Sequence, residues 1–347
     1  IMMHYMLGYL LFAGALSVDL SLLCAKKFEI FILSTLSTIV SCFIISILLF
    51  YSALLFKIHI SYIYCLLFGA LISPTDPIAV VAIFKNMKSF DLLATVVEAE
   101  SLFNDGVGVV LFITFASLIY DSNHVISFSK IILLFMQYAV GGIVFGLIMS
   151  YLLYFLLRKT NDAKIAILLS IAFVVSGYEI ADNFLHISAL LSMVVFGIFV
   201  ANYDKKHFLT PSSRNSLRNF WEIIDELLNA VLFLIIGLEV VMIKASLSLF
   251  LLAILMIFLV LLTRFVAVGM PLKILQLFHK DRSSPVSLLV WGGLRGGLAV
   301  ALSLSLNAGG ARDIIVTVTY TIVLFSILIQ GLTIKPLVNY WSKQSLK

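Results

Sequence analysis

Long apolar segments, separated by short polar breaks, recur along the whole chain. A helix needs about 20 mostly apolar residues to cross the hydrocarbon core of a bilayer, and most of these segments reach that length. Of the 347 residues, 62% are hydrophobic and 12% are charged, whereas a globular domain has about 45–50% and about 25%. No fold of this length hides so much apolar surface from water. The pattern excludes a water-soluble protein and predicts an all-α polytopic membrane protein that lies in the lipid bilayer.

The apolar pattern predicts about eleven transmembrane helices within a single transmembrane domain, residues 1–347. The expected ranges are 4–23, 28–56, 62–85, 92–120, 130–158, 163–181, 186–202, 222–243, 246–271, 285–307 and 313–339. Between the seventh and eighth ranges, the stretch 203–221 mixes basic and aromatic side chains. We expect it to lie along the membrane surface as a connector.

Basic residues gather on one side of the predicted membrane. If alternate loops share a side, seventeen basic residues fall on one side, four on the other and two (Arg264 and Arg295) inside the membrane, which accounts for all 23. By the positive-inside rule the richer side is cytoplasmic, so we expect the N-terminus of this chain outside the cell membrane and the C-terminus inside. Topology thus explains the net charge of +5 without a nucleic acid partner.

At least four charged residues lie well inside the predicted spans: Asp76, Glu100, Asp105 and Arg295. An ionisable residue at mid-bilayer costs about 2.5–3.5 kcal/mol on insertion scales, so such residues are usually paired or line a water-filled site. On the helix over 92–120, Ser101 lies one turn from Asp105 and Glu100 lies one turn from Asn104, which makes two adjacent polar stripes. Carboxylate, hydroxyl and amide oxygens suit a hard cation. A set of structural ion pairs and packing hydrogen bonds is the alternative.

Two of the predicted helices are expected to be discontinuous. The range 62–85 contains Ser73-Pro74-Thr75-Asp76-Pro77, and its two prolines lack backbone donors. An unwound carbonyl such as that of Thr75 then becomes available as a ligand, and the Asp76 carboxylate offsets the positive end of the new half-helix. The range 285–307 contains Gly292-Gly293-Leu294-Arg295-Gly296-Gly297. Its guanidinium lies within a membrane span, so we expect it to pair with a carboxylate. Glu100 is the expected partner of Arg295.

Three strings carry a family resemblance: Ser73-Pro74-Thr75-Asp76-Pro77-Ile78-Ala79-Val80, Glu100-Ser101-Leu102-Phe103-Asn104-Asp105-Gly106 and Trp291-Gly292-Gly293-Leu294-Arg295-Gly296-Gly297. With them the chain resembles the sodium/proton exchanger branch of the monovalent cation:proton antiporter superfamily, of prokaryotic type. The resemblance implies two six-helix inverted repeats with a linker helix, two crossing discontinuous helices, and a dimer domain beside a mobile core domain. On that template the chain lacks the first two of thirteen helices, and a homodimer is expected where those helices are present.

The resemblance also implies a role for each site residue. Asp105, beside Asn104, is similar to the family's ion-carrying carboxylate. Ser101 and the Thr75 carbonyl resemble its cation ligands, and Asp76 supports the site. Glu100 and Arg295 resemble an ion pair that ties the core helices together. Ala13 stands where many relatives have an acid that assists the cation. No cofactor is expected, since Na⁺ and H⁺ are the transported substrates.

The expected function is exchange of Na⁺ (or Li⁺) for H⁺ in pH homeostasis. Because one carboxylate, Asp105, holds either a proton or a cation, we expect electroneutral exchange with alternating access. The alternatives are a K⁺/H⁺ antiporter, and a passive cation channel or non-transporting sensor on the same fold. A non-enzymatic role is expected: an intramembrane aspartyl protease would use Asp76 and Asp105 as a dyad, but the chain lacks a Gly-x-Gly-Asp run and Asp76 lies between prolines.

Overall fold

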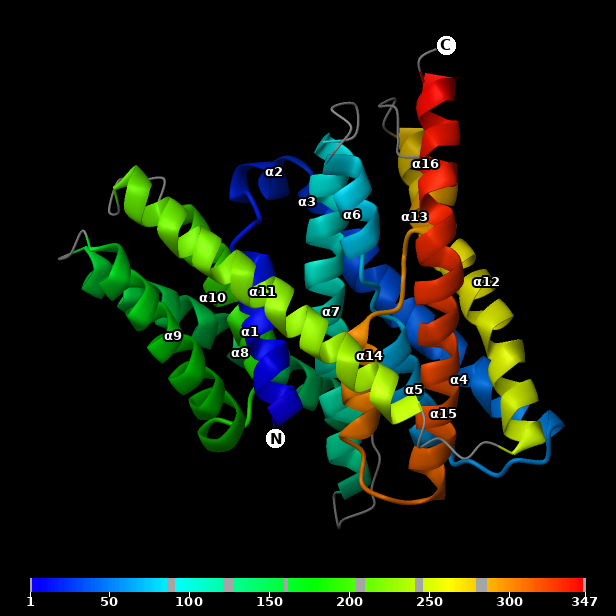
Figure 1. Cartoon of the computed structure of the whole chain (residues 1–347). Coiled ribbons are helices and arrows are strands. Elements are labelled where there is room, and N and C mark those ends of the chain that lie inside the picture. The colour runs from blue at the N-terminus through cyan, green and yellow to red at the C-terminus, as the bar shows by residue number, and fades with distance from the viewer. Residues whose placement is uncertain are drawn as a thin grey trace. The chain divides into compact units, whose positions relative to one another are not determined.

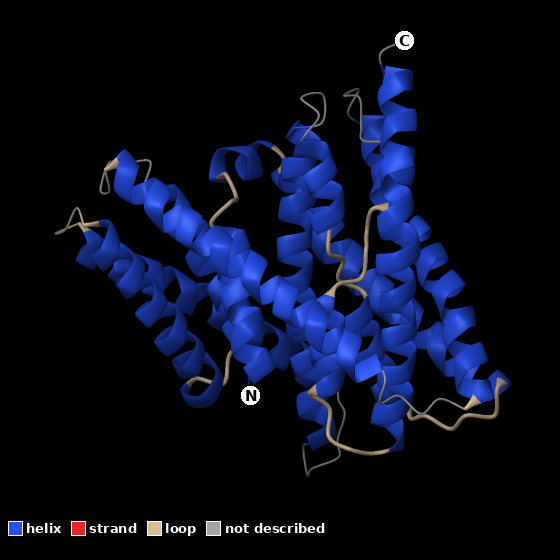
Figure 2. Ribbon diagram, viewed as in Figure 1, coloured by secondary structure: helices blue, strands red, loops and turns tan. Residues whose placement is uncertain are grey.

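A computed structural model describes residues 2–85, 91–120, 128–158, 162–203, 210–240, 246–278 and 286–345. Every regular element in these ranges is a helix (Figures 1 and 2). Six of the described helices are long and apolar enough to cross a membrane: Lys27–Leu55, Val96–Ile119, Ser129–Leu157, Ala163–Phe184, Leu247–Leu272 and Gly310–Val338. The all-α membrane fold is therefore confirmed, whereas the number of eleven spans stays a prediction.

The chain divides into two compact units, and both are built from segments distant in sequence. Unit 1 comprises Ile1–Ala25 and Val109–Ile235, and unit 2 comprises Lys26–Gly108 and Ile236–Lys347. Two 30-residue helices, α7 (Asp91–Tyr120) and α11 (Pro211–Val240), supply residues to both units. The connector expected over 203–221 lies partly outside the described residues, and from Pro211 onward it forms the first part of α11.

Unit 1 is held together by aromatic contacts between its helices. Besides parts of α7 and α11, its elements are α1 (Met2–Ala15), α2 (Leu20–Ala25), α8 (Phe128–Leu157), α9 (Ala163–Glu179), η3 (Ile180–Phe184) and α10 (Ala189–Tyr203). The ring of Phe12 lies 4.8 Å from that of Phe196 and 4.8 Å from that of Trp221. The Trp221 indole is buried and donates a hydrogen bond to the Ser170 hydroxyl at 2.9 Å, so the large ring keeps its polar atom satisfied.

The predicted span 4–23 is not one helix, because α1 ends at Ala15 and α2 begins at Leu20. The Asn202 side chain, on α10, bonds the intervening backbone. Its amide donates to the Val18 carbonyl and its oxygen accepts from the Leu20 amide, both at 2.9 Å. A single carboxamide thus satisfies backbone groups that a continuous helix would have satisfied internally.

An apolar stripe along α8 is exposed in unit 1. Its members recur at helical spacing: Leu133, Met136, Val140, Val144, Ile148 and Tyr151. A helix face of this kind is unfavourable in water but suits the hydrocarbon of a bilayer, because lipid is as apolar as the side chains. The stripe therefore agrees with the membrane location that the composition indicates.

Unit 2 contains both discontinuous helices. The first consists of α5 (Tyr62–Ile72) and α6 (Ile78–Lys85), and the second of α13 (Val286–Trp291) and α14 (Gly297–Leu304). Around them lie the other elements of this unit: α3 (Lys27–Phe31), η1 (Ile32–Leu36), α4 (Ser37–Leu55), α12 (Leu247–Phe278), α15 (Gly310–Phe325), η5 (Ser326–Gln330) and α16 (Gly331–Ser345). Helix α4 packs against α5 and α12, and α15 packs against α12 and α14.

Candidate functional site

The two helix breaks of unit 2 meet and bond to each other. The Asp76 amide donates to the Leu294 carbonyl at 2.8 Å, which forms an isolated antiparallel bridge between the breaks. In Figure 2 the two tan connections lie together near the middle of this unit. The two helix breaks, expected from the prolines and glycines, and their crossing, which the family resemblance implies, are therefore confirmed.

Backbone donors in the first break all have partners. Two of the five residues in Ser73-Pro74-Thr75-Asp76-Pro77 are prolines and have no N–H to satisfy. The Ser73 amide bonds the Gly69 carbonyl, and the Asp76 amide bonds Leu294 in the second break. The Thr75 amide donates to the Asn104 side-chain oxygen at 3.3 Å. An unpaired buried amide costs about as much free energy as a lost hydrogen bond. Because every N–H group of this break has a partner, the chain can stay unwound here without that cost.

Side chains of α7 form hydrogen bonds with both the backbone amide and the backbone carbonyl of Thr75. The Ser101 hydroxyl donates to the Thr75 carbonyl at 2.6 Å. The Asn104 side chain accepts from the Thr75 amide and donates to the Thr75 hydroxyl at 3.0 Å. All three residues are buried. The structure thus brings together Thr75, Ser101 and Asn104, which the sequence placed on two separate helices.

Asp105 follows Asn104 and lies at the edge of this cluster. Its side chain is half-buried, and within the described part of the chain no hydrogen bond is assigned to its carboxylate. Asp76 belongs to the break whose Thr75 is bonded by Ser101 and Asn104, the neighbours of Asp105 on α7. The first break therefore presents a carbonyl, a hydroxyl, an amide oxygen and two carboxylates within one small region, a set of hard oxygen donors.

Arg295 bonds the backbone of the first break. Its guanidinium donates to the Ser73 carbonyl at 2.6 Å and to the Pro74 carbonyl at 2.7 Å. These carbonyls follow the C-terminal end of α5, where a cation interacts favourably with the helix dipole. The expected ion pair between Arg295 and Glu100 is wrong in this structure, because Glu100 pairs with another arginine.

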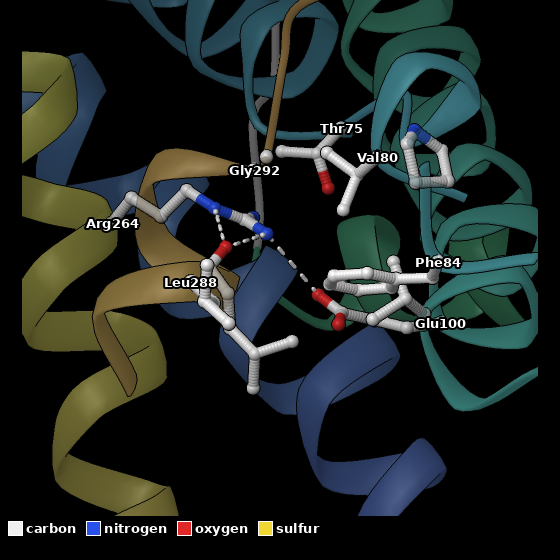
Figure 3. Close-up of a pocket in the computed structure, with 11 residues that line it drawn as sticks. Thr75, Val80, Phe84, Glu100, Arg264, Leu288 and Gly292 are labelled. Carbon is white, nitrogen blue, oxygen red and sulfur yellow. Dashed lines mark hydrogen bonds and ion pairs between the residues drawn. The ribbon is translucent and has the colours of Figure 1, made fainter. Parts of the chain in front are cut away.

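Glu100 pairs with Arg264 of α12. The Arg264 Nη2 atom lies 3.5 Å from Glu100 Oε1 and donates to the Leu289 carbonyl at 3.0 Å. Figure 3 shows the guanidinium between the Glu100 carboxylate and the end of α13, beside a small pocket lined also by Thr75 and Gly292. The second carboxylate oxygen of Glu100 has no hydrogen-bond partner in the described structure. In the sequence, Arg264 is charged and lies within a span, but that fact alone does not identify its partner.

Two glycines of the second break permit these close approaches. A Cβ atom at Gly293 would overlap the Arg264 guanidinium, and one at Gly296 would overlap the Asp76 carboxylate and lie 2.7 Å from the Asp76 Cβ. Neither glycine has a positive φ in this structure, so the requirement is for space. The glycine-rich string therefore serves contact between the two breaks and with α12.

Two crossed broken helices beside a half-buried acid and several oxygen donors define a secondary transporter of the membrane. The chain belongs to the sodium/hydrogen exchanger family, since the family model described as the transmembrane part of sodium/hydrogen exchangers matches residues 1–340.

Similar proteins agree with this membership. The chain is 42% identical over 343 residues to the Na⁺/H⁺ antiporter NhaP of Pseudomonas aeruginosa, covering 98% of this chain and 80% of the relative. It is 36% identical over 278 residues to the Na⁺/H⁺ antiporter NhaH of Halobacillus dabanensis, covering 78% and 67%. Its fold matches the solved sodium proton antiporter MjNhaP1 of Methanocaldococcus jannaschii with a TM-score of 0.75 and 20% identity, covering 96% of this chain and 83% of that one.

Proposed function

We propose that the protein exchanges Na⁺ (or Li⁺) for H⁺ across the cell membrane, with Asp105 as the group that carries the ion. The observation that supports this most directly is that Asp105 lies next to Asn104 and one helical turn from Ser101 on α7, and that both of these side chains bond Thr75 at the break of a membrane helix. The Na⁺/H⁺ antiporters among its relatives agree with this substrate pair.

In this proposal the ligands of the cation come from two elements. Asp105 and Ser101 approach it from α7, and the Thr75 carbonyl approaches it from the first break. Asn104 holds Thr75 in place by bonding both the backbone amide and the side-chain hydroxyl of Thr75. Asp76 supports the site through its charge and its position in front of α6. Na⁺ is a substrate here and not a resident cofactor, and the proposal needs no other metal or cofactor.

Competition at one carboxylate couples the two fluxes. A cation and a proton each neutralise Asp105, so only one of them is held at a time. The loaded site then carries the same charge in both directions, which makes the exchange electroneutral and one-for-one. Alternating access opens the loaded site to one side of the membrane and then to the other.

The test is exchange in proteoliposomes with a pH-sensitive dye, with Na⁺, Li⁺ or K⁺ added in turn. We expect Asp105→Asn to abolish cation-dependent proton movement, because an amide neither ionises nor releases a proton. The matched control is Asp313→Asn, the same substitution at an exposed acid in the first turn of α15, and it should keep wild-type exchange. Na⁺-dependent proton release that persists in Asp105→Asn contradicts the assignment.

Two other functions remain distinguishable in the same vesicles. A K⁺/H⁺ antiporter would respond to K⁺ with a lower KM than to Na⁺. A passive channel would carry current without counterflow, and the chain lacks a repeated carbonyl filter of the potassium-channel kind. Saturable counterflow with no current supports electroneutral antiport and excludes the channel.

We also propose an orientation and an assembly. The excess of basic residues on alternate loops supports a cytoplasmic C-terminus and an external N-terminus for this chain. A C-terminal fluorescent fusion that matures only in the cytoplasm tests it, and a dark fusion with full expression contradicts it. A homodimer is the proposed assembly.

A further inference from the structure

Two side chains of η5 hold the backbone of the second break. The Ser326 hydroxyl accepts a hydrogen bond from the Arg295 amide at 2.8 Å. The Gln330 amide donates to the Trp291 carbonyl at 3.2 Å. Ser326 is fully buried and Gln330 is 2% exposed. In the second break, these contacts bind the backbone donor of Arg295 and the backbone acceptor of Trp291, which lie on either side of Gly292 and Gly293.

The first break is held in a matching way. There, Ser101 and Asn104 of α7 bind the carbonyl and the amide of Thr75. Each break is therefore fixed by a hydroxyl and a carboxamide from one neighbouring helix, spaced three or four positions apart. Because one helix turn separates such positions, both side chains face the same break.

The helix that carries Ser326 and Gln330 is irregular at that point. Residues Ser326–Gln330 form a π-turn between α15 and α16, and the Gly331 amide donates to the Ser326 carbonyl. Single π-turns inside α-helices are rare and are frequently found at functional sites. The irregularity coincides with the two residues that reach the second break.

Bonds between the breaks link Ser326 to the proposed cation site. Arg295, whose amide Ser326 binds, donates its guanidinium to the Ser73 and Pro74 carbonyls. The adjacent Leu294 carbonyl accepts from the Asp76 amide. Both contacts fix the peptides on either side of Thr75, whose carbonyl is the proposed ligand. A displacement of the second break therefore moves the Thr75 carbonyl.

We propose that Ser326 and Gln330 are positioning residues for the cation site: they fix the second break and, through Leu294 and Arg295, set the position of the Thr75 carbonyl. The inference rests on the proposed function. It assigns to η5, which carries none of the proposed ligands, a share in cation affinity and in the choice between cations of different radius.

The experiment measures KM and kcat for Na⁺ and for Li⁺ in proteoliposomes of Ser326→Ala and Gln330→Leu. The control is Ser303→Ala, because Ser303 is also a buried serine of unit 2 but, among the residues that the structure describes, its hydroxyl bonds only the Val300 carbonyl of its own helix. We expect each η5 variant to raise the Na⁺ KM about fivefold and to change the ratio of the Li⁺ and Na⁺ KM values, with kcat less affected. Ser303→Ala should keep both values.

Comparing KM with kcat distinguishes a positioning role of these residues from a role in folding. A loss of folded protein lowers the rate for both cations alike and leaves KM and the ratio unchanged. If Ser326→Ala does not yield folded protein by size-exclusion chromatography, Gln330→Leu carries the test. Wild-type KM values and a wild-type ratio in the folded η5 variants, or an equal shift in Ser303→Ala, overturn the inference. Exchange that survives in Asp105→Asn overturns the proposed site instead, whatever the η5 variants do.

Discussion

Replacing Arg264 by methionine removes the partner of a buried carboxylate. In the structure Arg264 Nη2 lies 3.5 Å from Glu100 Oε1, and the two side chains are 9% and 3% exposed. At that distance two unit charges attract by about 5 kcal/mol at an effective dielectric constant of about 20. Removing one member of a buried pair costs about 3–5 kcal/mol, since the other charge stays buried without compensation.

The two single substitutions are expected to differ. Arg264→Met leaves Glu100 without its ion-pair partner and the Leu289 carbonyl without its donor. Glu100→Gln leaves Arg264 bonded to that carbonyl, and the glutamine oxygen still accepts. We therefore expect a loss of about 5 kcal/mol for Arg264→Met and about 3 kcal/mol for Glu100→Gln. At roughly 2 °C per kcal/mol, Tm falls by about 10 °C and about 6 °C.

The double variant distinguishes an ion pair from two separate contacts. With both charges removed, no unpaired charge stays buried, so Glu100→Gln/Arg264→Met should unfold at a higher temperature than Arg264→Met alone. Thermal unfolding of the purified proteins in detergent measures this, with Arg158→Met at the exposed end of α8 as the control. A double variant whose loss equals the sum of the two single losses would refute the reasoning, as would an Arg264→Met protein within about 2 °C of the parent.

Three further predictions concern the proposed site. Because a proton competes with Na⁺ for Asp105, the Na⁺ KM should rise as pH falls at fixed cation gradients, and a KM that does not vary with pH between 6 and 8 contradicts competition. Ser101→Ala removes a proposed ligand that also donates to the Thr75 carbonyl at 2.6 Å, so we expect about a fivefold to tenfold higher Na⁺ KM; an unchanged KM removes Ser101 from the site. Gly296→Ala places a Cβ against Asp76 and should lower kcat/KM for Na⁺ at least about tenfold, whereas Gly310→Ala, which meets nothing within 4 Å, should not.

Local rules in the sequence determined the helices and the breaks. Apolar length predicted membrane helices, and the structure places α4, α7, α8, α9, α12 and α15–α16 in the ranges that this rule selects. Prolines without N–H groups at 74 and 77 and paired glycines around Arg295 predicted two breaks, because backbone donors and side-chain space are properties of the residues themselves. Helical spacing likewise placed Ser101, Asn104 and Asp105 near one another.

Only the tertiary structure decided which buried charged residue pairs with which partner. The sequence shows two arginines and a glutamate inside spans, but the three residues are far apart along the chain. A buried charge needs a partner of opposite charge, and a pair between Glu100 and either arginine meets that need. Packing of α12 against α13 brings Arg264 to Glu100, while the crossing of the breaks brings Arg295 to the Ser73 and Pro74 carbonyls. The connection between α1 and α2 is likewise a feature of the tertiary structure, since its backbone bonds a carboxamide from α10. Contacts between distant segments depend on how helices pack against one another, and the periodicity of residues along the chain does not specify that packing.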